Sequence, residues 1–330
     1  MKLKVVQKSA TVAWSPIQEQ RELLVAGTVS GSIDTDFDTS SSIELFSLGN
    51  LSLVDDPPIQ LGSAPAQERF SKVAWSKPFT STTGEFYSLG VVAGGHGNGA
   101  VSFWNPSTLL DQASSDGAHL NSPSKLSSSG DMSKSTEGPS ALIRTEKHHT
   151  KAVHSVAFNP FQNSLLATCS NSELLIWDLQ KLSKPIPVLR GEHITSIAWN
   201  CMVQRILAVA NADGNITIWD LKAQKSIFNL PDESAEYKYR CRALAWHPNE
   251  ATILATASEN DKCPVIQIWD LRQKMSPLLR TLSGHTKGIW SLSWCPHDPN
   301  WLLSCSKDNK IFCWNLSTGK IAEEIRMGCN

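Results

Sequence analysis

The feature that most constrains this chain is a unit of three apolar segments that recurs six times along it. The first segment of each unit carries an aromatic residue, and the second is a short apolar run. The third ends near an aromatic residue, which belongs to a Trp-Asp pair in three of the six units. The aromatic residues of the first segments are Trp14, Trp75, Phe158, Trp199, Trp246 and Trp294. Those of the third segments are Phe46, Trp104, Trp177, Trp219, Trp269 and Trp314. From Phe158 onward the first set is spaced 41, 47 and 48 residues apart, close to the roughly 40–45 residues of a four-stranded propeller blade.

A fourth apolar segment completes several of these units. The segments at residues 184–189, 226–230 and 320–325 fit an outer strand that follows the Trp-Asp strand. Because the repeat runs from end to end, we expect a single domain over residues 1–330. The sequence therefore predicts an all-β chain that forms a β-propeller with six recognisable blades.

Charge and cysteine content exclude several classes of function. Lysine and arginine number 30 against 31 acidic residues, so no overall field favours a nucleic-acid backbone or an anionic membrane. The eight cysteines include no C-x-x-C pair, and buried free thiols explain them better than disulfides or zinc. The N-terminal residues lack the apolar stretch of a signal peptide, and no segment approaches the roughly 18 apolar residues of a membrane span. We expect a cytoplasmic protein that binds no nucleic acid.

One segment, residues 111–140, departs from the apolar pattern. It is rich in Ser, Asp, Gly and Pro and has few apolar residues to bury. Such a stretch cannot offset the conformational entropy lost on ordering. We expect a disordered insertion after the third strand of the second blade, and a phosphorylated regulatory loop is the functional alternative.

Polar residues of the sixth unit have the spacing of a stabilising network. His285 precedes the first strand, Ser304 lies on the second, Asp308 in the turn and Trp314 on the third. This order resembles the His-Ser-Asp-Trp network of WD-repeat blades, in which buried polar groups satisfy one another. A catalytic triad of His285, Ser304 and Asp308 is the competing interpretation, but no nucleophile elbow accompanies it. The third unit keeps a partial set, which is His149, Thr168, Asn171 and Trp177.

No other pattern indicates catalysis or a cofactor. The glycine cluster from Gly94 to Gly99 follows a strand, as a dinucleotide-binding loop would. The residues after it alternate as a strand, so no helix N-terminus is available to hold a phosphate, and we expect a tight hairpin. Metal-ligand spacings and paired carboxylates are also missing from the sequence. We expect no enzyme activity, no metal, no cofactor and no small-molecule substrate.

Three residues are candidates for a partner surface. Trp290 and Trp301 lie off the repeat, and exposed tryptophan is enriched at interfaces, although partial burial at a blade edge is the competing interpretation. Arg272 completes a Trp-Asp-x-Arg sequence that begins at Trp269. Some WD-repeat proteins dock through this motif to the adaptor of a cullin-type ubiquitin ligase. A substrate receptor of such a ligase is therefore an alternative function.

Segments along nearly the whole chain resemble one family of WD-repeat proteins, the SEC31 family of the COPII vesicle coat. The most specific segment runs from Pro264 to Arg272 and follows Ala257-Ser258-Glu259. The others are at residues 1–4, 13–16, 26–28, 43–46, 68–70, 92–95, 241–248, 276–278, 307–310 and 313–315. The part of the family that the chain resembles is its N-terminal propeller.

This resemblance implies a non-enzymatic scaffold at the vertices of the outer cage, acting in vesicle formation from the endoplasmic reticulum to the Golgi. The implied partners are the small propeller subunit of the outer coat and neighbouring vertex propellers. The implied location is the cytoplasmic surface of endoplasmic reticulum exit sites and COPII vesicles, with membrane association only through the coat.

The resemblance also raises a question of ring closure. The family propeller has seven blades, whereas this chain ends after the fourth strand of the sixth unit. The alternating segment at residues 3–7 has the length to pair beside residues 320–325. Without that pairing we expect an incompletely closed ring, whose strand edges would recruit partners or aggregate.

Overall fold

The computed structural model describes residues 8–29, 40–49, 58–116, 140–181, 184–190, 193–230, 240–273 and 275–326. The chain divides into two compact units. The first consists of residues 1–156 and 178–183, and the second of residues 157–177 and 184–330. The predicted pairing of residues 3–7 lies outside the described residues.

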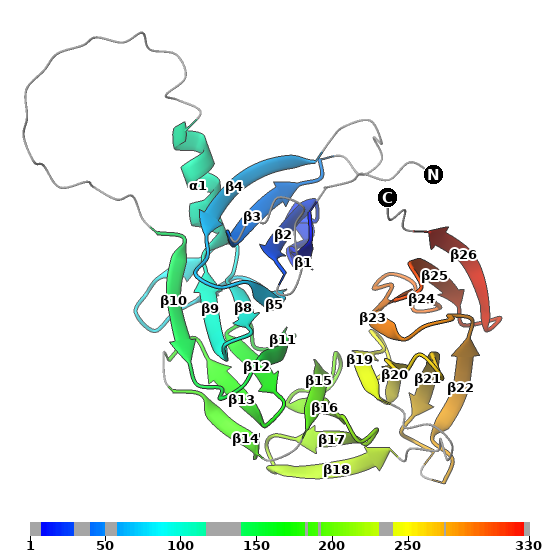
Figure 1. Ribbon diagram of the computed structural model, residues 1–330. Helices are drawn as coiled ribbons and strands as arrows, with labels where there is room; N and C mark the ends of the chain where they lie inside the picture. The colour runs from blue at the N-terminus through cyan, green and yellow to red at the C-terminus, as the bar shows by residue number, and fades with distance from the viewer. Residues whose placement is uncertain are drawn as a thin grey trace, which may run out of the picture. The chain divides into compact units, whose positions relative to one another are not determined.

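Six antiparallel four-stranded sheets, here called blades 1 to 6, make up most of the described chain (Figure 1). Within each blade the strands pair in chain order, so each strand lies beside the blade strand that follows it in the sequence. The hairpin expected at the glycine cluster is the β8–β9 connection, where Gly99 has a φ of +87° that favours glycine. The predicted all-β architecture of six blades is confirmed.

The blades have the following bounds. Blade 1 contains β1 (Ala10–Trp14), β2 (Leu23–Thr28), β3 (Ser42–Ser47) and β4 (Ile59–Pro65). Blade 2 contains β5 (Phe70–Trp75), β8 (Val92–His96), β9 (Ala100–Trp104) and β10 (Leu142–Lys147). Blade 3 contains β11 (Val153–Phe158), β12 (Leu165–Ser170), β13 (Glu173–Asp178) and β14 (Ile186–Arg190).

The remaining blades follow the same order. Blade 4 contains β15 (Ile194–Trp199), β16 (Ile206–Asn211), β17 (Ile216–Asp220) and β18 (Lys225–Leu230). Blade 5 contains β19 (Cys241–Trp246), β20 (Ile253–Ser258), β21 (Val265–Asp270) and β22 (Leu278–Ser283). Blade 6 contains β23 (Ile289–Trp294), β24 (Trp301–Ser306), β25 (Lys310–Asn315) and β26 (Lys320–Arg326).

Apolar side chains join neighbouring blades within each unit. Val25 of blade 1 and Val73 of blade 2 belong to one buried cluster. Ile218 of blade 4 shares a second cluster with Trp246 of blade 5. Full burial of such a side chain contributes about 1.5–3 kcal/mol relative to leaving it exposed. The period-2 alternation of the strands places these residues on the faces between blades.

The first-strand tryptophans of blades 4, 5 and 6 also tie each of these blades to the one before it. Each of three indole N–H groups donates to a backbone carbonyl on the first strand of the preceding blade. These bonds are Trp199 Nε1 to Ala157 O at 2.9 Å, Trp246 Nε1 to Ala198 O at 3.0 Å and Trp294 Nε1 to Ala245 O at 3.0 Å. A buried indole needs such an acceptor. The repeated tryptophan therefore fills volume and sets the register between blades.

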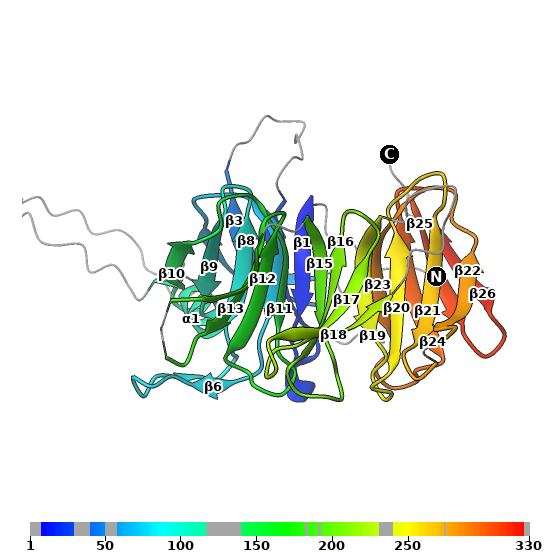
Figure 2. The ribbon, with the colours of Figure 1, turned by 90° about the horizontal axis from the view of Figure 1, so that it is seen from below.

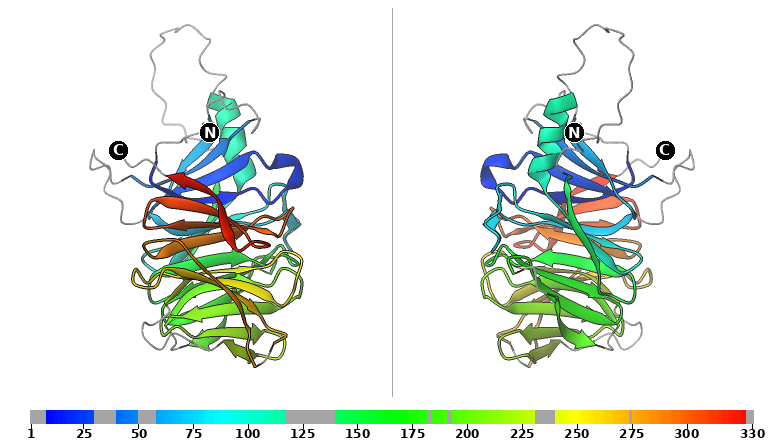
Figure 3. Two further views of the ribbon diagram at one scale, coloured as in Figure 1. Left: turned by 90° about the vertical axis from the view of Figure 1, so that its right-hand side faces the viewer. Right: turned by 90° about the vertical axis from the view of Figure 1, so that its left-hand side faces the viewer.

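Helix α1 (Pro106–Asp116) follows the third strand of blade 2 and lies against β3 and β4 of blade 1 (Figures 1 and 3). Asn105 precedes it and accepts the N–H of Ser107 on Oδ1 at 3.1 Å, while Pro106 has no N–H to satisfy. The expected disordered insertion over residues 111–140 is therefore wrong at its start, because residues 111–116 are helical. Residues 117–139 lie outside the described part of the chain.

The contact between α1 and blade 1 depends on a glycine. A Cβ built on Gly62 of β4 would lie 2.0 Å from the carbonyl oxygen of Leu109, whose side chain is fully buried. We expect Gly62→Ala to displace the helix and lower the free energy of unfolding by about 1–3 kcal/mol. Thermal denaturation measures the loss, with the exposed neighbour Ser63→Ala as control. Equal melting temperatures for the two variants would contradict the packing described here.

A short hairpin interrupts blade 2 between its first and second strands. It consists of β6 (Phe79–Thr80) and β7 (Phe86–Tyr87) and projects beyond the ends of the blade strands (Figure 2). Gln180, just after β13, accepts the N–H of Thr82 on its carbonyl at 3.1 Å and donates its side-chain amide to the carbonyl of Thr80 at 3.3 Å. These bonds hold the hairpin against the β13 turn.

Helical structure is sparse in the described chain. Besides α1, the residues that the structure describes contain one three-residue 3-10 helix, η1 (Gln18–Gln20). Neither helix of this described part has the length and apolar character needed to cross a membrane.

Candidate interaction surfaces

The four residues expected to form a network in blade 6 lie together. Ser304 Oγ is 2.7 Å from His285 Nε2 and accepts the indole N–H of Trp314 at 2.8 Å. His285 Nδ1 is 3.0 Å from Asp308 Oδ2, which also accepts the backbone N–H of Thr286 at 2.9 Å. Because Asp308 is a carboxylate acceptor, the imidazole carries its proton on Nδ1 and accepts the Ser304 hydroxyl on Nε2.

The charge states of this network follow from its burial. Burial lowers the pKa of His285, which outweighs the nearby Asp308, so the imidazole is neutral at pH 7. Burial alone would raise the pKa of Asp308, but hydrogen bonds from Thr286 N–H and His285 hold the pKa of this carboxyl below its usual value. The polar atoms of the four side chains thus satisfy one another.

The arrangement of His285, Ser304 and Asp308 resembles a catalytic triad, but the Ser304 hydroxyl is not accessible to a substrate. The Ser304 side chain is in a residue only 1% exposed, and its oxygen is already engaged by the indole of Trp314. A nucleophile needs a site about 3 Å away in which the reacting atom of a substrate can lie. In the described part of the chain, Ser304 is buried and its oxygen is shared between His285 and Trp314, which is the arrangement of a blade network.

Every third-strand tryptophan of blades 2 to 6 donates its indole N–H to a hydroxyl oxygen, but the strand that supplies the hydroxyl differs between blades. The bonds are Trp104 to Ser102 (2.8 Å), Trp177 to Thr168 (2.8 Å), Trp219 to Thr217 (3.1 Å) and Trp269 to Thr256 (3.0 Å), besides Trp314 to Ser304. In blades 2 and 4 the hydroxyl comes from the third strand, two residues before the tryptophan. Hydroxyl–indole pairing is therefore a general feature of these blades.

Blade 2 holds a second imidazole network that the sequence interpretation missed. His96 Nε2 is 2.7 Å from Ser102 Oγ, and its Nδ1 is 3.1 Å from the carbonyl of Arg69. His96 ends the second strand here and does not precede the first, so the spacing differs from that of blade 6. The available signal was the sequence His-x5-Ser-x-Trp from His96 to Trp104.

The partial set of blade 3 is distributed differently. Trp177 and Thr168 are bonded to each other, whereas the backbone carbonyl of Asn171 accepts the N–H of Ile194 at 3.3 Å. His149 is buried, and burial lowers the pKa of its imidazole from 6.5 to about 4. This histidine is therefore neutral at pH 7.

Arg272 pairs with the aspartate of its own Trp-Asp motif. Its Nε and Nη2 groups donate to Asp270 Oδ1 and Oδ2 at 2.9 and 2.8 Å, and Nη2 lies 3.6 Å from Glu250. The hydrogen bond from Arg272 holds the pKa of Asp270 below its usual value. Such fork-shaped pairing stabilises a nearly buried carboxylate. Arg272 is thus paired within blade 5, although its side chain is 62% exposed.

The two off-repeat tryptophans lie in different environments. Trp301 begins β24, is partly buried, and donates its backbone N–H to the carbonyl of Asp298 at 3.1 Å. Trp290, on β23, is 51% exposed. Arg242 and Lys307 place their cations 5.9 and 5.8 Å from its ring centroid. The structure therefore separates the two residues, and Trp290 is the one displayed to solvent.

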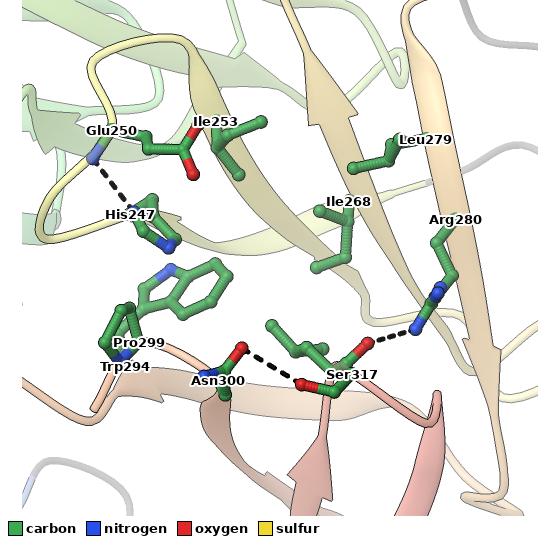
Figure 4. A pocket seen from close by; sticks show the side chains of 11 residues that line it. His247, Glu250, Ile253, Ile268, Leu279, Arg280, Trp294, Pro299, Asn300 and Ser317 are labelled. Atoms are coloured by element: carbon green, nitrogen blue, oxygen red, sulfur yellow. Dashed lines mark hydrogen bonds between the residues drawn. The ribbon is translucent and has the colours of Figure 1, made fainter.

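A pocket of about 290 Å³ lies between blades 5 and 6 (Figure 4). Ile268 and Trp294 line it, and the imidazole of His247 packs edge-on against Trp294 with 4.8 Å between ring centroids. Polar groups around it bond to the protein: His247 Nδ1 accepts the N–H of Glu250 at 2.9 Å, and Arg280 donates to the Leu316 carbonyl. The described residues also contain no cluster of three His, Cys, Asp or Glu side chains able to hold a metal. This pocket is a crevice between blades 5 and 6.

Comparison with known proteins identifies the blades. The family WD domain, G-beta repeat, matches residues 140–178, 183–220 and 276–315. SEC31 of Dictyostelium discoideum is 38% identical over 331 residues, which cover 98% of this chain and 23% of that protein. Sec31B of Mus musculus is 36% identical over 334 residues, covering 98% and 26%, and Sec31A of Gallus gallus is 37% identical over 333 residues, covering 98% and 24%.

A solved structure agrees with these relatives. A chain of the structure described as COPII on membranes, outer coat vertex, superposes with a TM-score of 0.74 and 29% sequence identity, covering 97% of this chain and 76% of that one. The chain is a WD-repeat propeller of the SEC31 type. It spans about a quarter of the length of the curated SEC31 relatives that it matches. The resemblance drawn from the sequence is thereby confirmed, and the ubiquitin-ligase alternative is not favoured.

Proposed function

We propose that this SEC31-type propeller is a non-enzymatic scaffold of a COPII outer coat and occupies the vertices of its cage. The observation that carries the proposal is the match of 97% of the chain to an outer coat vertex structure. A second similar structure is described as the COPII coat assembled on membranes, with the same TM-score of 0.74. Blades joined by hydrogen bonds and apolar clusters suit a part of a scaffold.

The proposal extends to partners and location. We assign contacts with neighbouring vertex propellers and with the small propeller subunit of the outer coat. The protein would then lie on the cytoplasmic face of endoplasmic reticulum exit sites and of COPII vesicles. The hydrogen-bonded and buried state of the Ser304 hydroxyl supports the absence of a catalytic role.

A competition experiment tests the vertex assignment. This chain is purified and added in excess to a coat that is reconstituted on liposomes. It should occupy the vertex contacts without extending the lattice. We expect fewer closed outer cages by electron microscopy, while inner-coat recruitment, measured by flotation, stays unchanged. Cage formation that is indifferent to an excess of the folded propeller would contradict the proposal.

A further inference from the structure

The first strands of four blades have a β-bulge at their second residue. In blades 2, 4, 5 and 6 the pairing with the second strand skips one residue at this point. A bulge leaves the extra residue out of the ladder and re-aims its side chain. The bulged residues are Ser71, Thr195, Arg242 and Trp290.

In blades 4 and 5 the bulged side chain reaches the next blade. Thr195 Oγ1 donates to the carbonyl of Cys241 in blade 5 at 2.7 Å. The Arg242 guanidinium lies over the ring of Trp290 in blade 6, 5.9 Å from its centroid. Trp290 is itself the bulged residue of blade 6 and is 51% exposed, whereas the repeated Trp294 on the same strand is 9% exposed. The bulges of blades 5 and 6 thus bring the Arg242 guanidinium beside the exposed indole of Trp290.

Two cations and two carboxylates lie around Trp290, but only one of the cations is paired with the carboxylates. Lys307 lies 5.8 Å from the ring centroid and is already paired with Asp261, 3.5 Å away, and with Glu259, 3.8 Å away. Asp261 also accepts the N–H of Gly288 at 2.9 Å. The Arg242 guanidinium has no carboxylate partner among the residues that the structure describes. The indole N–H of Trp290 likewise donates to none of them.

A second arginine, Arg240, lies two residues before Arg242 in the chain. Arg240 is exposed, and its carbonyl accepts the N–H of Glu259 at 2.8 Å, which fixes its backbone beside the same loop. An arginine without a local partner binds carboxylates through two parallel hydrogen bonds. An exposed tryptophan supplies a flat apolar surface and one hydrogen-bond donor. Together these groups complement a ligand that carries carboxylates next to an aromatic ring.

We propose that Trp290, Arg242 and Arg240 form a docking site for an acidic peptide segment with an aromatic residue. The aromatic side chain stacks on the Trp290 indole, and flanking carboxylates pair with the two arginines. The chain has no overall positive charge, which favours a short acidic peptide over a nucleic-acid strand. The inference stands independently of the coat assignment, since it depends only on contacts within blades 5 and 6.

Fluorescence anisotropy tests this site with a defined probe. The probe is a fluorescein-labelled peptide of glutamates around a central phenylalanine, and the matched control peptide carries lysines in place of the glutamates. We expect saturable binding of the acidic peptide only, weakened about tenfold or more by Trp290→Ala or by Arg242→Ala. Arg326→Ala, which removes an exposed arginine from the same blade, should leave the affinity unchanged, and raised salt should weaken binding.

Three results would overturn the proposal. The first is no saturable binding of the acidic peptide, or equal binding by wild type and the Trp290→Ala variant. The second is equally tight binding of a labelled single-stranded oligonucleotide, which would indicate a general polyanion surface. The third is a fall in melting temperature for Trp290→Ala as large as that for Trp294→Ala, which would show that Trp290 packs in the core.

Discussion

Replacing Trp314 with alanine should lower the free energy of unfolding by about 3–5 kcal/mol. The indole is 2% exposed, packs at a right angle against Phe312 with 5.6 Å between ring centroids, and donates to Ser304 Oγ. Its loss opens a cavity between blades 5 and 6 and removes the donor that Ser304 needs. Chemical denaturation measures the change, because the midpoint and slope together give the free energy.

Two further variants separate volume from hydrogen bonding at this site. Trp314→Phe keeps most of the ring but leaves the Ser304 oxygen without its indole donor, so we expect a loss of about 1–3 kcal/mol. His285→Ala should cost a similar amount, because Asp308 and Ser304 both lose a buried partner. Trp290→Ala is the exposed control. If the Trp314→Ala and Trp290→Ala variants unfolded at the same denaturant concentration, the network would not contribute as described.

Acid should destabilise the protein between about pH 6.5 and 4. Burial lowers the pKa of His149 to about 4 in the folded chain, from 6.5 for the free side chain. Because the folded pKa is the lower one, the unfolded chain binds the proton first as the pH falls. The stabilisation is complete above pH 6.5 and is lost as the pH falls toward 4, a loss of about 3 kcal/mol for this residue. Burial lowers the pKa of His96 and His285 as well, which adds to the same trend.

The pH dependence of stability checks this account. Unfolding free energies measured from pH 7 down to pH 4 should fall steadily for the wild type. A His149→Gln variant should show a shallower slope, whatever its stability at pH 7. Parallel slopes for wild type and His149→Gln would contradict a buried neutral imidazole at this position.

The repeating strands of this chain could be predicted from the sequence because two periods coincide there. Alternation within a strand and the recurring aromatic position both indicate burial between blades. The outer segments predicted at residues 226–230 and 320–325 match β18 (Lys225–Leu230) and β26 (Lys320–Arg326) to within one residue at each end. The same packing recurs in each unit, so the apolar pattern of a strand can be compared with that of the equivalent strand in the other units.

Features that occur once were harder to predict. Helix α1 has only Leu109 and Leu110 as a clear apolar pair, and its stability comes from packing on blade 1 at Gly62. The β6–β7 hairpin is too short to show an alternation. The bulges at Arg242 and Trp290 shift the register by one residue, which a regular strand pattern conceals.

The hydrogen-bonded networks could be predicted only where the histidine, serine, aspartate and tryptophan follow one another along the chain in the order usual for WD-repeat blades. His285, Ser304, Asp308 and Trp314 follow that order. In blade 2 the histidine moves to the end of the second strand and the hydroxyl to the third, yet the Ser102 oxygen still joins an imidazole to an indole. Geometry in space is preserved there while spacing in the sequence changes.

Electron cryotomography of coats on membranes tests the central assignment most directly. A SEC31 subunit whose own propeller is exchanged for this chain would be assembled with the other coat components on liposomes. The vertex assignment predicts closed cages with propeller density at each vertex, indistinguishable in lattice geometry from those of the unexchanged subunit. A folded, coat-recruited chimaera that forms no vertices, or vertices without propeller density, would contradict it.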